Sequence, residues 1–190
     1  MYKVLFIFST TLYSNAYALF NEFSKIDSSE ATALTQKNPI NAKQIPIHTA
    51  KSLYPEPFSS MVKNRTKRKL GDHFGLVNFG VNLTTLSPNS ISALKHHHSR
   101  QDEFIYIISG NPTLIFGENE YLLSPGDCFG FKANSGIGHQ LVNKTASEVT
   151  YLEVGDRTPA DSVEYPDDDL AFIQKADGTW SVLHKDGTPY

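Results

Sequence analysis

Residues 96–110 of this chain read HHHSRQDEFIYIISG. In a β-strand successive side chains point to opposite faces, so His96 and His98 share one face while His97 points the other way. Glu103 follows after four residues, at the start of an apolar run with strand character. Imidazole nitrogen and carboxylate oxygen are the usual donors for zinc, iron, manganese and nickel. The stretch therefore predicts that two imidazoles and one carboxylate surround a metal ion.

A second segment supplies a fourth candidate ligand. Residues 126–143 read GDCFGFKANSGIGHQLVN, and His139 stands between two turn-bounded apolar segments of strand composition. A lone histidine triplet would be a polar turn or the remnant of a tag, but a distant histidine in a second motif argues against that interpretation.

The two segments together resemble the paired motifs of the cupin superfamily. The first reads H-x-H, four residues, E, six residues, G, and the second reads G-D, a turn, H, three residues, N. The resemblance implies one divalent transition metal held by His96, His98, Glu103 and His139. The chain departs from the pattern at Ser90, Lys132 and Asn134, where the family usually has glycine, proline and glycine. The remaining sequence from about residue 71 is similar to small single-domain bacterial cupins that mostly lack an assigned reaction, and this similarity implies a homodimer.

The spacing of strands and turns leads independently to the same fold. Short β-rich segments alternate with clusters of Gly, Pro, Asn and Asp, which is typical of an antiparallel barrel or jelly roll. We expect an all-β chain, a single double-stranded β-helix or jelly-roll barrel with N- and C-terminal extensions. The expected strands are 74–86, 91–98, 103–109, 113–116, 120–123, 128–132, 139–142 and 149–154.

The domain organisation follows from composition. We expect a leader at residues 1–18, an N-terminal arm and connecting segment at 19–69 with a short helical patch near 28–36, the cupin barrel at 70–156, and a C-terminal tail at 157–190 packed on the barrel. The leader has a lysine, a short apolar run and a small-x-small site, Ala16-Tyr17-Ala18, as in a secretory signal. Two locations remain open: the cytoplasm, or export to the periplasm.

Composition excludes several classes of function. A net charge of −3 and 39% hydrophobic residues describe an ordinary globular protein with no nucleic-acid surface, and the apolar run in the leader is too short to cross a membrane. The basic segment 63–69 (KNRTKRK) is interpreted as a solvated loop that could steer an anionic ligand toward a cavity mouth. The single cysteine, Cys128, cannot form an intrachain disulfide and is expected to be a small buried hydrophobe.

Strand alternation predicts the surroundings of the site. If the candidate ligands face the interior, Leu94, Ile105, Ile107 and Leu141 form an aliphatic floor beneath them, and Phe104, Tyr106 and Ile108 cover the opposite face. Asp102 points away from Glu103, and Asn143 makes hydrogen bonds in a turn or near the site. His184 is expected at the surface or in packing.

The reaction stays open at this point. The first hypothesis is a metal-dependent enzyme that acts on a small, oxygen-rich molecule, as a dioxygenase, an isomerase or a decarboxylase. The alternative is a non-catalytic module that binds a metal or a small ligand. No residue is assigned a catalytic role, and Tyr106, Tyr151 and Glu153 are interpreted as structural. A solvent-open pocket with a polar group across from the metal would favour the enzyme, and a sealed apolar cavity the module.

Overall fold

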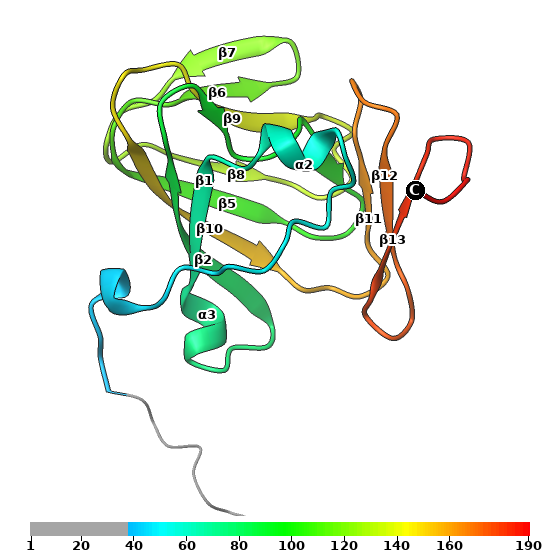
Figure 1. Ribbon diagram of the computed structural model, residues 1–190, viewed down its shortest axis with the longest axis horizontal. Coiled ribbons are helices and arrows are strands. Elements are labelled where there is room, and N and C mark those ends of the chain that lie inside the picture. The colour runs from blue at the N-terminus through cyan, green and yellow to red at the C-terminus, as the bar shows by residue number, and fades with distance from the viewer. Residues whose placement is uncertain (1–37) are drawn as a thin grey trace, which may run out of the picture. The chain divides into compact units, whose positions relative to one another are not determined.

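Two antiparallel sheets face each other in the computed structural model, which describes residues 38–190 (Figure 1). The first sheet has five strands in the order β1 (Arg65–Lys69), β2 (Phe79–Leu86), β10 (Val149–Asp156), β5 (Glu103–Ser109) and β8 (Cys128–Phe131). The second has four, in the order β3 (Ser90–Ile91), β9 (His139–Asn143), β6 (Thr113–Phe116) and β7 (Asn119–Leu122). The prediction of an all-β jelly-roll barrel is confirmed.

The main core lies between these sheets, and the alternation of the strands explains it. Along β5 the isoleucines at 105 and 107 are buried while Phe104, Tyr106 and Ile108 are exposed, so β5 has one core face and one outer face. Leu114 of β6 and Leu141 of β9 meet the isoleucines from the other sheet. Three residues of the predicted aliphatic floor, Ile105, Ile107 and Leu141, therefore share this core, whereas Leu94 is buried in a second cluster with Leu170 and Phe172.

A third sheet extends the barrel at the C-terminal end of the chain. It contains β13 (Trp180–Leu183), β12 (Ala171–Gln174), β11 (Ser162–Glu164) and β4 (His97–His98), in that order. A second core cluster packs here around Leu170 and Phe172, with Trp180 against it. The predicted C-terminal tail, residues 157–190, thus contains three short strands, β11, β12 and β13, and these are joined to the histidine segment through β4.

Helices are short in the described part of the chain. They are the 3-10 helix η1 (Ala42–Gln44), α2 (Phe58–Met61) and α3 (Leu70–His73). Among residues 38–190 no helix has the length and apolar character to cross a membrane. The predicted leader at 1–18 and the helical patch near 28–36 lie outside the described residues, and the described structure falls almost wholly in one unit, Ile40–Tyr190.

Several details differ from the sequence prediction. The strand expected at 74–86 begins only at Phe79, because α3 and its turn occupy the preceding residues. The single strand expected at 91–98 is two, because β3 pairs with β9 in one sheet and β4 pairs with β11 in another, so the chain crosses between sheets. The basic segment is not a loop, since Arg65–Lys69 forms edge strand β1. Cys128 is exposed rather than buried.

The glycine that closes the first motif has a backbone reason. Gly110 adopts φ +78°, and a Cβ atom added there would lie 2.7 Å from the carbonyl oxygen of Glu148. A side chain would therefore be unfavourable for two reasons: the left-handed backbone conformation, and a clash with Glu148, the residue just before β10. The turn after β5 consequently requires glycine.

Candidate metal centre

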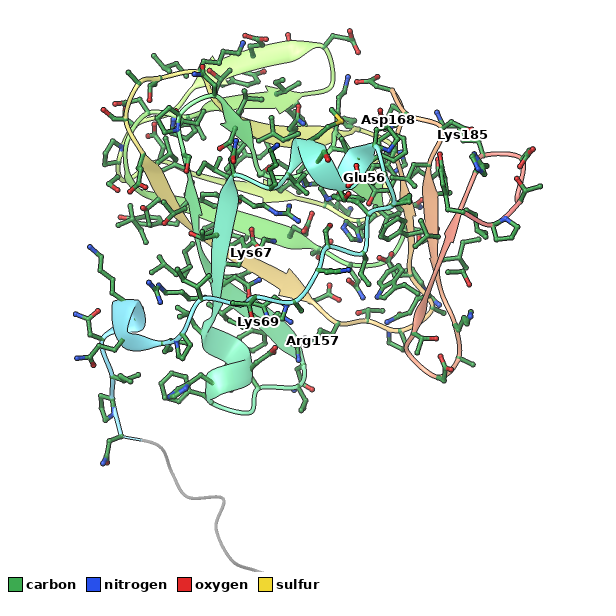
Figure 2. The ribbon with its side chains drawn as sticks, in the orientation of Figure 1. Glu56, Lys67, Lys69, Arg157, Asp168 and Lys185 are labelled. Carbon is green, nitrogen blue, oxygen red and sulfur yellow. The ribbon has the colours of Figure 1, made fainter. Side chains whose placement is uncertain are left out.

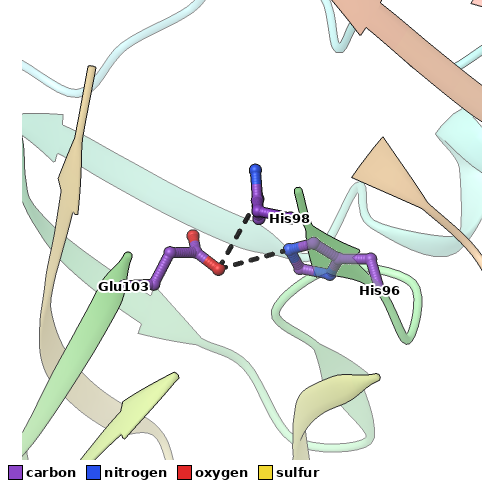
Figure 3. Close-up of side chains that lie close together, drawn as sticks. All are labelled: His96, His98 and Glu103. Carbon is purple, nitrogen blue, oxygen red and sulfur yellow. Dashed lines mark ion pairs between the residues drawn. The ribbon is translucent and has the colours of Figure 1, made fainter. Parts of the chain in front are cut away.

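Two histidines and one glutamate meet inside the barrel. The Nε2 atoms of His96 and His98 each lie 3.6 Å from Oε2 of Glu103 (Figure 3). The ligand atoms of these three residues all lie within 4.8 Å of one another. His98 belongs to β4, His96 precedes it, and Glu103 begins β5 after the short loop that the sequence predicted. One short segment of chain therefore supplies all three groups.

His139 approaches the same carboxylate from the second sheet. The backbones of His96 and His139 form an antiparallel bridge, with His139 donating its N–H to the carbonyl of His96 at 2.8 Å and His96 donating in return at 3.2 Å. This pairing brings Nε2 of His139 to 2.8 Å from Oε2 of Glu103. The ring is stacked on Phe131 with centroids 3.6 Å apart. Its place next to the compact group is fixed, and its role as a fourth ligand stays a prediction.

The Nδ1 atoms of the three histidines have different hydrogen-bond partners. Nδ1 of His96 lies 2.7 Å from the carbonyl oxygen of Leu94, and Nδ1 of His98 lies 2.6 Å from Oδ2 of Asp161. Both contacts suit an Nδ1–H donor, so in the neutral form of each ring Nε2 carries the lone pair that can coordinate a metal. Nδ1 of His139 is buried and has no hydrogen-bond partner among residues 38–190.

Burial and charge oppose each other at these groups. Burial would raise the pKa of Glu103, but the imidazoles of His139 and His96 and the charge of His98 outweigh it, so its pKa lies well below the usual range. Burial lowers the pKa of His98, yet the Asp161 carboxylate and the charge of Glu103 raise it above its usual value. For His139 burial prevails, and its pKa is lowered. The site thus holds an ionised carboxylate among imidazoles.

The donor set fits a transition metal. Oε2 of Glu103 is buried and makes no hydrogen bond of acceptable geometry to any described residue, although three imidazole nitrogens lie within 3.6 Å of it. An orphaned acceptor costs free energy in a protein interior unless a cation or a donor satisfies it. Two or three imidazoles with one carboxylate are a donor set for zinc, iron, manganese or nickel.

The centre opens into a cavity of about 900 Å³. His96, Glu103 and His139 form part of its wall. Three further polar residues, Lys67, Tyr151 and Glu153, line the same cavity. Lys67 Nζ lies 2.5 Å from Oε1 of Glu153, and Tyr151 Oη donates to Oε2 at 3.2 Å. Asn82 Nδ2 donates to Oε1 of Glu153 at 2.9 Å. A polar group therefore lies in the same open cavity as the ligand cluster.

Other residues that the sequence considered lie away from the cluster. His97 points outward as alternation predicted, with Nε2 3.7 Å from Glu164. Asp102 accepts a hydrogen bond from the backbone N–H of Ala133. His184 contacts Asp169 near the surface. None of them belongs to the compact ligand group.

Asn143 proves to be a structural residue of a turn. Its Nδ2 donates to the carbonyl oxygens of Leu86, Ser87 and Ser147 at 2.8–3.0 Å, and its Oδ1 accepts from Thr145. The side chain is fully buried. The asparagine of the second motif therefore joins the ends of β2 and β9 and does not contact the candidate ligands.

Sequence analysis missed two participants of the site. Asp161 orients His98 but precedes β11, 63 residues further along the chain, and no local pattern marks it. Lys67 was placed in a solvated loop, although it lines the cavity beside Glu153. The segment RTKRK has four charged residues and one threonine, a composition that favours a solvated loop over a strand whose alternate residues line a cavity.

Comparisons with known proteins identify the family of this fold. The family model for the cupin domain matches residues 82–155. The structure is similar to the crystal structure of a sugar phosphate isomerase of the cupin superfamily from Silicibacter pomeroyi, with 37% identity and a TM-score of 0.75, covering 80% of this chain and 96% of the other. A comparison with proteins of curated function finds no match.

Two further solved structures are similar. One is a candidate sugar phosphate isomerase from Acidithiobacillus ferrooxidans, at 28% identity and a TM-score of 0.60, covering 66% of this chain and 80% of the other. The other, the polyketide cyclase RemF from Streptomyces resistomycificus, shares 20% identity with a TM-score of 0.50 over 63% and 79% of the two chains, and supports the fold alone.

The fold and the site together define the class of protein: a small jelly-roll barrel whose interior holds a cluster of histidines and a glutamate as a candidate metal centre. This chain belongs to the cupin superfamily.

Proposed function

We propose that this protein is a metal-dependent isomerase that acts on a small phosphorylated sugar. The observation that carries the proposal is the solvent-open cavity of about 900 Å³, whose wall contains His96, Glu103 and His139 together with Glu153. A sealed apolar cavity would have favoured a non-catalytic binding module. An open cavity with a second ionisable group instead supports turnover.

His96, His98 and Glu103 would hold the metal, with His139 as the fourth ligand. When bound, such a metal polarises a carbonyl or hydroxyl oxygen of a sugar and stabilises the negative charge that develops on it. Open positions would remain for two oxygens of the substrate, because these metals accept five or six ligands. The buried, unpartnered Oε2 of Glu103 supports this assignment of the ligands.

Glu153 is the residue that we assign to proton transfer. Burial raises the pKa of this carboxyl, but the charge of Lys67 and its contact with Glu153 outweigh burial, so the pKa is lowered and the group is ionised at neutral pH. An ionised carboxylate can remove a proton from the carbon beside a sugar carbonyl and return it to the former carbonyl carbon. When the hydroxyl proton of that neighbouring carbon also passes to the former carbonyl oxygen, the two transfers interconvert an aldose and a ketose. Tyr151 donates to Oε2 of Glu153 and fixes its position.

The similar structures support the same chemistry. One solved structure, 37% identical to this chain, is a sugar phosphate isomerase, and a second, 28% identical, is a candidate for that activity. The match covers 96% of the first of these chains, so it extends well beyond the two motifs.

The proposal is tested by hydrogen exchange in the substrate. Protein loaded with Zn²⁺, Fe²⁺, Mn²⁺ or Ni²⁺ is incubated in D₂O with a panel of aldose and ketose phosphates, and NMR follows deuterium incorporation and product formation. We expect the wild type to label and isomerise at least one pair, and Glu153→Gln to lose this activity while it retains the metal.

Glu120→Gln is the matched control. Glu120 forms an ion pair with Lys144 at 2.7 Å, but on β7 and away from the cavity, so exchange should be unchanged in this variant. A wild-type protein that binds metal and the sugar phosphates but catalyses neither exchange nor isomerisation with any metal would overturn the proposal and favour the binding module. Full activity in Glu153→Gln would overturn the role of Glu153.

A further inference from the structure

Edge strand β1 turns a row of cations toward the cavity. Arg65 and Lys67 line the cavity and the intervening Thr66 does not, as expected for alternate residues of a strand. Lys63, just before β1, and Lys51, in the segment ahead of α2, line it too. The basic segment therefore forms part of the cavity wall.

These cations differ in their partners. Lys67 is neutralised by Glu153 at 2.5 Å, as described above. Arg65 has no carboxylate within ion-pair distance among residues 38–190, and its one side-chain hydrogen bond there is from Nη1 to the carbonyl oxygen of Ser92. A guanidinium has five N–H donors in a planar fork. Arg65 is thus a half-buried cation with spare donors at the wall of a cavity.

The acidic residues of the cavity are already engaged. Glu103 faces the histidines, and Glu153 faces Lys67. Glu56, just ahead of α2, accepts hydrogen bonds from the hydroxyls of Ser59 and Ser60 in that helix. In Figure 2 Glu56 lies beside α2 and Lys67 lies on β1. Arg65 is therefore the cation of this wall that has no carboxylate close to it. Lys63 and Lys51 lie in the same wall.

Two tyrosines connect the Arg65 side of the cavity to the ligand cluster. Tyr165 stacks on His96 with ring centroids 5.8 Å apart, and its hydroxyl donates to the hydroxyl of Tyr54 at 3.3 Å. Burial raises the pKa of both phenols. The positive charge of Arg65 opposes this rise at each of them but does not outweigh burial. Arg65, Tyr54 and Tyr165 line the same cavity, and Tyr165 borders the ligand cluster through its stacking on His96.

We propose that Arg65, assisted by Lys63, binds the phosphate monoester of the substrate while the sugar oxygens lie at the histidine and glutamate cluster. This inference rests on the proposed function and assigns its specificity to particular residues. Arginine pairs with phosphate oxygens through two parallel N–H donors, and lysine adds a point charge. A dianionic phosphate matches two cations better than a singly charged carboxylate does.

The direct test uses inorganic phosphate as the probe, on the metal-loaded full-length chain, by isothermal titration calorimetry with acetate as the comparison anion. We expect phosphate to bind and acetate to bind at least about tenfold more weakly. Arg65→Gln should weaken phosphate binding by about tenfold or more, since a charge-assisted hydrogen-bond pair is lost. Arg65→Lys should give an intermediate affinity, because it retains the charge but not the fork.

Lys69→Gln is the matched control. Lys69 lies on the same strand, at its α3 end near Arg157, but outside the cavity, where it pairs with Asp72 at 3.6 Å (Figure 2). Its phosphate affinity should equal that of the wild type. Metal content and thermal midpoint are measured for every variant. If Arg65→Gln does not fold, Lys63→Gln takes its place, with an expected loss of about threefold or more.

The outcomes separate this inference from the proposed function. Unchanged phosphate affinity in a folded Arg65→Gln variant, or acetate binding as tight as phosphate, overturns the phosphate site even if the protein isomerises sugars. Conversely, Arg65-dependent phosphate binding in a protein that shows no isomerisation supports the site and contradicts the isomerase.

Discussion

Nδ1 of His98 lies 2.6 Å from Oδ2 of Asp161, a carboxylate that is only 1% exposed. The other oxygen of Asp161 accepts hydrogen bonds from the backbone N–H of Arg100 and from the hydroxyl of Ser99. These two hydrogen bonds therefore hold the carboxylate in place independently of its contact with the imidazole. A buried acceptor at Nδ1 selects the tautomer whose Nε2 lone pair faces Glu103, so this contact prepares His98 for metal binding.

We predict that Asp161→Asn weakens metal binding about 10- to 100-fold. An amide nitrogen in place of Oδ2 would donate to Nδ1, and the ring proton would then move to Nε2, where it blocks coordination. Metal dissociation constants from competition with a chelator provide the measurement. The control is Asp169→Asn, which alters the similar His184–Asp169 contact of 2.7 Å outside the site. Equal affinity in the wild type and Asp161→Asn would contradict the prediction.

Substitution of single ligands should remove stoichiometric metal. We expect His96→Ala, His98→Ala, Glu103→Gln and His139→Ala each to copurify with far less metal than the wild type, since each loses one donor. Elemental analysis of tag-free protein gives the metal content. His97→Ala is the adjacent control, because His97 faces Glu164, and it should retain full metal. Full occupancy in His139→Ala alone would reduce the ligand set to the other three residues.

Asn143→Ala should lower the free energy of unfolding by roughly 2–4 kcal/mol. The substitution leaves three carbonyl oxygens without the amide donor that they share, and each buried unsatisfied group costs about 1–3 kcal/mol before relaxation. Urea denaturation measures the change. Asn111→Ala, which removes an exposed donor to Leu123, should cost less than about 1 kcal/mol. Metal content of the folded variant should not change, because Asn143 does not contact the ligands.

The ion pair of Lys67 and Glu153 should make stability depend on acid pH. The folded pKa of Glu153 is lowered, so its carboxylate stabilises the fold above the unfolded pKa of about 4.3, and this contribution is lost as pH falls from there through the folded pKa. In metal-free protein, Glu153→Gln should be less stable than the wild type by about 1–2 kcal/mol at pH 7 and show a smaller difference near pH 3.

Urea midpoints across this pH range provide the check. The stability of Glu120→Gln should differ little from that of the wild type at any pH. Glu120 and its partner Lys144 are both about half exposed, and such surface ion pairs contribute little to stability. A stability difference between wild type and Glu153→Gln that stays constant from pH 7 to pH 3 would contradict the ion-pair explanation.

Much of the barrel was predictable because strand alternation is a local property. The pattern of β5 alone assigns Ile105 and Ile107 to the core and Tyr106 to the outside, and the structure agrees. The same alternation placed His96 and His98 together and turned His97 away. The basic strand β1 could not be found in this way, because its inward side chains are the cations Arg65 and Lys67, which line an open cavity instead of a closed apolar core.

By itself, the sequence determined the fold class and three clustered candidate ligands, His96, His98 and Glu103, since a short strand and loop fix their spacing. Only the tertiary structure decided that Asp161 contacts His98. It also decided that Arg65, Lys67 and Glu153 line the cavity. These residues come from strands and loops far apart in the chain, and their proximity depends on how the sheets pair and curve. Local patterns carry no information on such pairing, so the chemical surroundings of the centre emerge only when the chain is folded.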